Sequence, residues 1–319
     1  KIPWQMTLTV PTEHMAVSNT PIESATDDDG WVRTTFERTP PMPSYLLAIA
    51  TGPFDAVTIP DMRVPTRVIC PKGKGHLAGE TVRTAPPILA ALEDYFDRPY
   101  PYDKLDFIAV PEFWPGAMEN PGAITYRDTL LLRDPEAVTV SQKRTLASVH
   151  AHELAHMWFG NLVTMEWWDD LWLNESFATW LGDKIADQVY PEYGLAVSSV
   201  EGTERAMATD AKATTEAIRA PVLAEENMET MQAGITYQKG AAVLGMFESF
   251  IGDDLFRDGV RNYIEANAWG NAVADDLFGS LTDRAGEEVC SAMSTFIDQP
   301  GVPNVRVTTL GVGKGELTQ

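Results

Sequence analysis

The first 57 residues alternate between apolar and polar positions in short runs that predict β-strands. Three such runs are M-T-L-T-V, G-W-V-R-T-T-F-E-R-T and Y-L-L-A-I-A-T-G-P-F, and Pro-rich or Asp-rich turns such as D-D-D-G separate them. Three strands alone make a poor independent domain. We therefore expect residues 1–57 to be the C-terminal part of a larger N-terminal β-sheet domain.

From residue 58 strands and helices mix. The runs R-V-P-T-R-V-I-C, L-D-F-I-A-V-P, A-I-T-Y and T-L-L-L predict strands by their apolar and β-branched content. Between the first two, T-V-R-T-A-P-P-I-L-A-A-L-E-D-Y-F predicts a helix with Pro86 near its start. Its apolar residues recur at helical spacing: Ile88, Leu89, Leu92 and Phe96.

The second half of the chain predicts helices almost throughout. Helical periodicity is found in F-A-T-W-L-G-D-K-I-A-D-Q-V, S-S-V-E-G-T-E-R-A-M-A, D-D-L-F-R-D-G-V-R-N-Y-I and V-A-D-D-L-F-G-S-L. The segment Q-K-G-A-A-V-L-G-M-F-E-S-F-I carries an apolar stripe of Val243, Leu244, Phe247, Phe250 and Ile251. A sheet lobe followed by a helical lobe predicts an α+β fold.

Between the two lobes lies H-E-L-A-H, with histidines at 152 and 156. On a helix, four-residue spacing places both imidazoles on one face, one turn apart, which suits two ligands of a tetrahedral metal ion. The metal expected for such a pair is zinc. Glu153 follows the first histidine, so its carboxylate reaches the same site without being a ligand, where a general base belongs.

A catalytic zinc site needs three protein ligands and one open position. Glu175 is the best third candidate, because it opens a second predicted helix, N-E-S-F-A-T-W-L-G-D-K-I, after a tryptophan-rich connection. Gly160 suits a left-handed cap that ends the first helix and lets the chain turn back. We therefore predict a zinc site made by His152, His156 and Glu175.

Two further motifs do not identify a function by themselves. G-A-M-E-N, at Gly116 to Asn120, stands among prolines that favour a loop or a sheet edge, where a substrate's main chain could pair. Taken alone, it is better explained as a turn with an exposed acid. Tyr237, in I-T-Y-Q-K-G, is by sequence alone a packing residue with a solvated hydroxyl.

Together, H-E-L-A-H, the following N-E, G-A-M-E-N and T-Y-Q-K-G resemble the gluzincin aminopeptidases, the family of aminopeptidase N and leukotriene hydrolase. The resemblance covers roughly residues 1–305. It implies that residues 1–57 end a β-sandwich domain, that 58–302 form a thermolysin-like zinc peptidase domain, and that 303–319 begin a following β domain or linker. The cleft would lie between the sheet lobe and the helical lobe.

The resemblance also implies a function and the roles of further residues. The chain would be a zinc aminopeptidase, with one zinc per chain, that releases N-terminal residues from peptides. Glu119 would bind the free α-amine, and the Tyr237 hydroxyl would stabilise the oxyanion. The backbone of Gly116 and Ala117 would pair with the substrate, and Met118 would border the first side-chain pocket.

Composition limits the partners. The chain has 24 basic and 46 acidic residues, a net charge of −22, which repels nucleic acid and anionic membranes. We interpret this charge as a solvated surface rather than as an attraction for cationic peptides. No apolar run is long enough for a membrane span. Cys70 and Cys290 are expected to be free thiols. The compartment stays open between the cytoplasm and export to a space such as the periplasm.

Two alternatives remain at this stage. One is an inactive, truncated family member that binds peptide; the other is an epoxide hydrolase of the same family. Met157 and Ser176 stand where the family often has Gln and Gly, and we expect neither difference to change the chemistry. The resemblance implies further N-terminal and C-terminal domains in the same polypeptide, and we expect activity to depend on them.

Overall fold

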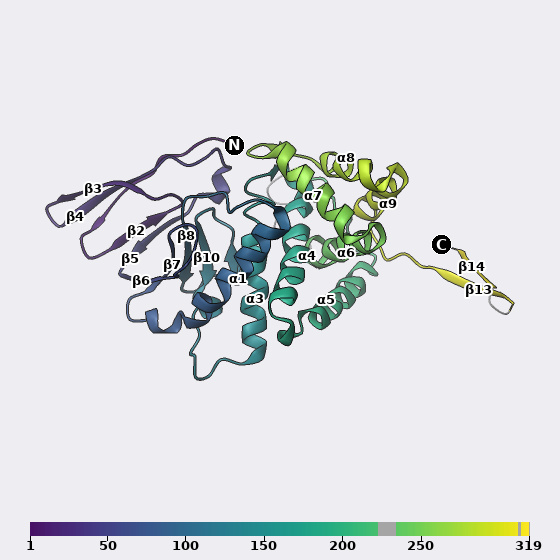
Figure 1. Ribbon diagram of the computed structural model, residues 1–319, viewed down its shortest axis with the longest axis horizontal. Helices are drawn as coiled ribbons and strands as arrows, with labels where there is room; N and C mark the ends of the chain where they lie inside the picture. Colours follow the sequence, from purple (N-terminus) through teal and green to yellow (C-terminus); the bar gives the residue numbers. More distant parts are fainter. Residues whose placement is uncertain (223–233, 312–313, 319) are drawn as a thin grey trace.

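The computed structural model describes residues 1–222, 234–311 and 314–318. The strands of the first half of the chain gather at one end of the molecule and most helices at the other, with α1 (Gly79–Phe96) and α3 (Val140–Ala155) between them (Figure 1). This segregation of sheets and helices along the chain confirms the mixed character that the sequence predicts.

The N-terminal segment forms two small antiparallel sheets. One contains β1 (Thr7–Pro11), β4 (Trp31–Phe36) and β3 (Ile22–Asp28) in that order, and the other pairs β2 (Met15–Ser18) with β5 (Ile49–Gly52). The sequence pattern missed β2 and β3. All residues of β3 are exposed, so this strand shows no alternation of apolar and polar residues.

A five-stranded sheet follows, in the order β6-β7-β8-β10-β9. Its strands are β6 (Phe54–Thr58), β7 (Thr66–Pro71), β8 (Leu105–Val110), β10 (Ala123–Arg127) and β9 (Ala117–Met118). The three central strands run parallel, whereas β6 and β9 are antiparallel edge strands. The domain boundary expected at 57/58 falls inside β6.

Both faces of this sheet are covered, because alternate side chains point to opposite faces. Val68 and Phe107 join the main core, which continues through α1, α3 and α4 (Trp172–Val189) to the C-terminal helices. Ile69 and Ile108, their neighbours in the chain, pack instead with Val17 of β2. The sheet is therefore held between the N-terminal strands and the helical layer.

Helix α1 crosses from β7 to β8 and begins earlier than predicted. It starts at Gly79, so Pro86 and Pro87 lie inside it rather than near its start. Pro87 cannot donate to the carbonyl of Arg83, one turn before it. The Tyr190 hydroxyl donates to that carbonyl at 3.3 Å, which compensates for the missing hydrogen bond.

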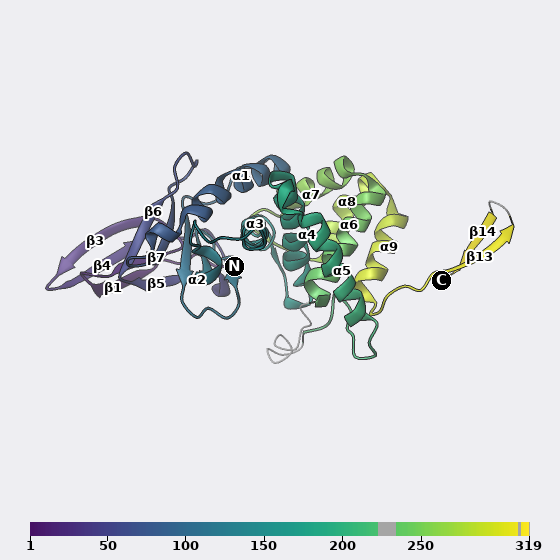
Figure 2. The same cartoon turned by 90° about the horizontal axis from the view of Figure 1, so that it is seen from below.

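The helical end contains α5 (Leu195–Asp210), α6 (Gly240–Ile251), α7 (Asp253–Asn267), α8 (Ala274–Ala285) and α9 (Glu287–Asp298). Seen from below, α9 lies at the outer side of this bundle, and β13 (Arg306–Gly311) and β14 (Lys314–Thr318) form a hairpin beyond it (Figure 2). Of the stripe predicted on α6, Val243, Leu244 and Phe247 are buried, but Phe250 is 74% exposed.

One predicted strand is wrong. T-L-L-L, residues 129–132, belongs largely to the short helix α2 (Asp128–Leu131), in which Leu131 is buried. A short apolar run cannot distinguish a strand from a buried helical turn by its periodicity. Cys70 and Cys290 are both free, as expected. Among the described residues, no helix combines the length and apolar character that crossing a membrane requires.

Candidate metal centre and active site

Helix α3 carries the histidine pair. It begins with a capping box, in which Thr139 accepts from the backbone N–H of Gln142 and the Gln142 side chain accepts from the Thr139 N–H. His152 lies in its last turn and His156 directly follows its last residue, Ala155. Gly160 has a positive φ of 115°, but it lies beyond the end of the helix rather than capping it, which corrects the prediction.

Helix α4 carries the third predicted ligand, Glu175, in its first turn. Further along, Gly182 lies against α3: a Cβ atom there would be 2.8 Å from the backbone nitrogen of His152 and 3.0 Å from its Cα. Only glycine permits so close an approach. The two helices are therefore in backbone contact at His152, which brings their ligands together.

The structure brings His152, His156 and Glu175 together, with one candidate ligand atom of each within 4.8 Å of the others. The two Nε2 atoms are 3.1 Å apart, and Oε2 of Glu175 lies 3.4 and 3.5 Å from them. Tetrahedral ligands bound roughly 2.1 Å from a zinc ion are separated by roughly 3.4 Å. The three donors therefore fit one small divalent cation.

The outer nitrogens of both imidazoles have partners that orient the rings. Nδ1 of His156 donates to the Phe159 carbonyl at 3.0 Å, because a carbonyl oxygen can only accept. Nδ1 of His152 lies 3.4 Å from the Thr179 hydroxyl of α4. Contacts of this kind leave Nε2 directed at the metal position.

The charges around the centre favour a cation. Burial alone would lower the pKa of His156, but the carboxylates of Glu119, Glu175 and Glu153 raise this pKa to about 10. Burial alone would raise the pKa of Glu175, but His156 and hydrogen bonds from both imidazoles lower it overall. The negative charge gathered around His156 thus favours a cation at this position.

Glu153 is the predicted base, and its carboxylate is buried next to the ligands. Its Oε2 has no hydrogen-bond partner among the described residues. Burial, and then the charges of Glu119 and Glu175, raise the pKa of the carboxyl group, while His156 opposes the shift. An unpaired buried carboxylate is costly unless a ligand or water uses it. This position therefore has the free acceptor that proton transfer requires.

G-A-M-E-N includes the edge strand β9, as predicted, with Gly116 before the strand and Glu119 and Asn120 after it. Ala117 and Met118 pair with β10, and the Gly116 carbonyl accepts from the Arg127 N–H at 2.7 Å. The other edge of β9 has no partner strand in the described part of the chain. Main-chain groups on this edge can bind an extended peptide by strand addition.

Glu119 follows β9 and is buried rather than exposed. Burial raises the pKa of this carboxyl group, and the charge of Glu175 adds to the shift while His156 opposes it. Its backbone carbonyl accepts from the Asn161 side chain at 2.8 Å, which ties the end of β9 to the turn after α3. A second buried carboxylate is thus held beside the metal cluster.

Tyr237 lies on the π-helical turn η6 (Gly234–Lys239), which leads into α6. Its ring stacks with that of His152, at 6.0 Å between centroids and 14° between planes. Burial and then the charge of Glu175 raise the pKa of its hydroxyl. The phenol is therefore protonated near neutral pH and lies at the metal cluster. Glu119, Glu153 and Tyr237 thus lie close enough to the three candidate ligands to shift the pKa values of one another's groups or of the ligands.

Tyr45 is a residue of this centre that the sequence analysis missed. It lies on the short 3-10 helix η1 (Ser44–Leu46), in a run that predicted a strand, so nothing local marked it. Burial raises the pKa of its hydroxyl, followed by the charges of Glu119 and Glu175. The Asn174 side chain donates to this hydroxyl at 3.4 Å. The N-terminal segment thus supplies a side chain to the centre.

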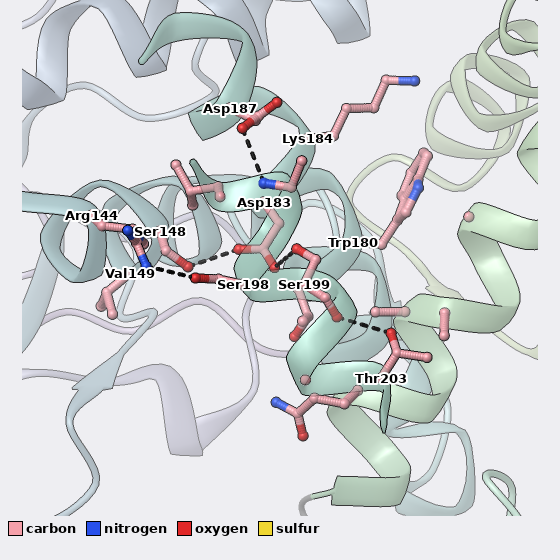
Figure 3. Close-up of a pocket in the computed structure, with 18 of the residues that line it drawn as sticks. Arg144, Ser148, Val149, Trp180, Asp183, Lys184, Asp187, Ser198, Ser199 and Thr203 are labelled. Carbon is pink, nitrogen blue, oxygen red and sulfur yellow. Dashed lines mark hydrogen bonds between the residues drawn. The ribbon is translucent and has the colours of Figure 1, made fainter. Parts of the chain in front are cut away.

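A cavity of about 570 Å³ lies between α3, α4, α5 and the start of α6 (Figure 3). Hydrogen bonds join residues that line the cavity. Asp183 accepts from Ser148 at 2.8 Å and from Ser199 at 2.9 Å, and Arg144 donates to Ser198 at 3.0 Å. The lining includes Thr179, which contacts His152, and Gln238, which follows Tyr237. The cavity therefore borders the Nδ1 side of His152, which faces away from the position between the three candidate ligands.

Two imidazoles and a carboxylate thus surround one point that could hold a metal ion, and a carboxyl group with an unpaired oxygen lies beside them. Sequence comparison matches residues 80–296 to the peptidase family M1 domain and residues 1–46 to the peptidase M1 N-terminal domain. The chain belongs to peptidase family M1.

Relatives support this assignment. A leucyl aminopeptidase of Saccharolobus solfataricus is 39% identical over 313 residues, which cover 98% of this chain and 40% of that protein. Aminopeptidase M1-A of Oryza sativa subsp. japonica is 40% identical over 319 residues, 99% of this chain and 36% of that protein. Aminopeptidase M1 of Arabidopsis thaliana is 38% identical over 322 residues, 100% of this chain and 36% of that protein. The chain thus spans between 36% and 40% of the length of these relatives.

Proposed function

We propose that this chain contains the catalytic centre of a zinc aminopeptidase that acts on peptides with a free N-terminus. The observation that carries the proposal is the pair of buried carboxylates, Glu119 and Glu153, beside the ligand set of His152, His156 and Glu175. One carboxylate serves the reaction, and the other recognises the substrate's amine. The aminopeptidase names of the relatives support the same activity.

His152, His156 and Glu175 would hold the zinc ion, because their two Nε2 atoms and one carboxylate oxygen lie together. When bound, this ion supplies Lewis acidity, which lowers the pKa of water toward about 7 and polarises a carbonyl. Phe159 and Thr179 orient the imidazoles from behind through their contacts with the two Nδ1 atoms. The rings therefore need little rearrangement to bind the metal.

Glu153 acts as the general base. Its unpaired Oε2 accepts a proton from the water molecule whose oxygen attacks the scissile carbonyl carbon. The Tyr237 hydroxyl donates a hydrogen bond to the oxyanion that forms. When the C–N bond breaks, Glu153 passes the proton to the leaving amine. The carboxylate ends the cycle ionised, as it began.

Glu119 limits cleavage to the first peptide bond. Its carboxylate binds the protonated α-amine, and the free edge of β9 at Gly116 and Ala117 pairs with the main chain of the substrate. Met118 borders the pocket for the first side chain.

We infer the domain organisation from the same comparison. Residues 1–57 end a β-sandwich domain, 58–302 form a thermolysin-like peptidase domain, and 303–319 begin a following β domain or linker. The two family matches, at 1–46 and 80–296, are consistent with this division.

Blocking the substrate amine tests the role of Glu119. An aminoacyl p-nitroanilide should be hydrolysed, and its N-acetylated form should react at least about a hundredfold more slowly, because the amide has no charge to pair with a buried carboxylate. The measurement is the release of nitroaniline by the purified protein. Glu119→Gln should lose most of this discrimination. Equal turnover of the two substrates by the unmodified protein would exclude an exopeptidase.

Removing the metal tests the ligand set. Dialysis against a strong chelator should abolish peptidase activity, and one equivalent of Zn²⁺ should restore it. The melting temperature should fall on removal and recover on addition, because an ion that binds only the folded state stabilises that state. Activity that survives complete chelation would contradict the metal mechanism. Zinc binding without any turnover would instead indicate the inactive peptide-binding family member.

A further inference from the structure

A hydrogen bond joins the backbone next to Tyr237 to the element that carries Glu175. The Ser176 hydroxyl, on α4, donates to the Thr236 carbonyl, on η6, at 2.7 Å. Ser176 follows Glu175 in the chain, and Thr236 precedes Tyr237. Ser176 is fully buried, and Thr236 is nearly so. This contact therefore connects the neighbours of a metal ligand and of the tyrosine.

The start of α6 leaves room for this hydroxyl. A Cβ atom on Gly240 would lie 1.9 Å from Oγ of Ser176 and 2.7 Å from its Cβ, so any side chain at 240 would displace the serine. Gly240 has no positive φ, so its backbone does not require glycine. The small residue is needed for space, and the space is filled by the Ser176 side chain.

The π-helical turn needs such a contact. π-helical turns are rare and are found mostly at functional sites. On this turn, Tyr237 must direct its hydroxyl to within hydrogen-bonding distance of an oxyanion, and a displacement of about 1 Å can cost on the order of a hundredfold in rate. The hydrogen bond from Ser176 fixes the position of the peptide unit just before Tyr237 relative to α4.

We propose that Ser176 is a positioning residue for the reaction: its hydroxyl aligns Tyr237 with the metal centre through the Thr236 carbonyl. This inference rests on the proposed function, because it assigns Tyr237 to the oxyanion. It differs from a packing role, in which Ser176 would merely fill the space above Gly240. The two roles predict different kinetics.

Ser176→Ala removes the hydroxyl and keeps Cβ. We expect kcat for an aminoacyl anilide to fall about tenfold, with KM and zinc content within twofold of the unmodified protein, because only the transition state uses the tyrosine. The matched control is Ser18→Ala. Ser18 is also buried and donates to a backbone carbonyl, that of Ala48, at 2.9 Å. This control should leave kcat unchanged.

A double-mutant cycle separates positioning from packing. Tyr237→Phe should lower kcat about a hundredfold. In the Tyr237→Phe background, Ser176→Ala should have an effect of less than twofold, because there is no longer a hydroxyl to align. An undiminished tenfold effect in that background would overturn the proposal. So would a Ser176→Ala variant whose kcat equals that of the unmodified protein.

Placing the side chain at position 240 instead of position 176 tests the packing alternative directly. Gly240→Ala should lower kcat, and adding Ser176→Gly should restore the melting temperature by removing the overlap, but not kcat. Full recovery of kcat in this pair would show that space alone matters and would overturn the proposal. If the unmodified, zinc-loaded protein hydrolyses no aminoacyl substrate, the proposed function itself fails, and that result is distinct from these.

Discussion

Glu153→Gln is expected to lower kcat by about 10²- to 10⁴-fold while the protein keeps its metal, because this range is what a general base contributes. The carboxylate has a buried, unpaired oxygen and does not belong to the cluster of three possible ligands. Glutamine has nearly the same shape but cannot accept the proton of the attacking water. Zinc content by elemental analysis and kcat for an aminoacyl anilide are the two measurements.

His156→Ala provides the contrast. This imidazole is buried, and its Nε2 is 3.1 Å from that of His152. We expect the variant to lose both the metal and the rate, since a zinc site seldom survives with two protein ligands. Near-normal turnover of Glu153→Gln would remove the base assignment. Loss of zinc from Glu153→Gln would instead mean that this carboxylate helps to bind the metal.

The ligand set could be predicted from sequence because its geometry is local. Four-residue spacing places His152 and His156 on one helix face whatever the rest of the chain does. Glu175 needed one further assumption, that the next helix returns to the first, and the structure brings all three together. Their chemical roles, and those of Glu119, Glu153 and Tyr237, stay predictions that the experiments above can test.

Contacts between distant segments could not be predicted in this way. Tyr45 reaches the centre from the N-terminal segment, and its run of apolar neighbours predicts only a strand. Ser176 and Gly240 fit each other across two helices, although each alone is an ordinary small residue. A pattern along the chain reports which face of an element is buried, but not which residue of another element it meets.

Part of the acidic composition is concentrated at the candidate metal centre. The net charge of −22 was interpreted as a solvated surface, yet three of the glutamates are buried within one centre. Their charges raise the pKa of His156 to about 10 although burial opposes protonation. Buried like charges repel strongly in a low dielectric. A divalent cation relieves this repulsion, so metal binding and the stability of the centre are coupled.

Gly182→Ala is expected to destabilise the fold by about 2 to 3 kcal/mol and to weaken zinc binding about 10- to 100-fold. The new Cβ would lie 2.8 Å from the backbone nitrogen of His152 and 3.2 Å from the carbonyl carbon of Ala151. These are backbone atoms of α3, so the overlap cannot be relieved by rotating a side chain. The two helices must separate, and His152 moves away from Glu175. Thermal denaturation and competition with a zinc chelator measure the two effects.

The matched control is Gly279→Ala, on α8. This glycine is also inside a helix, and no atom lies within 4 Å of the position that its Cβ would occupy. Alanine there should stabilise the protein by about 0.5 to 1 kcal/mol through its higher helix propensity and leave zinc binding unchanged. The same propensity gain acts at Gly182, so a net loss there must come from the helix contact. If Gly182→Ala proves as stable as Gly279→Ala and binds zinc normally, α3 and α4 are not in backbone contact at His152, and close helix packing does not set the geometry of the metal centre.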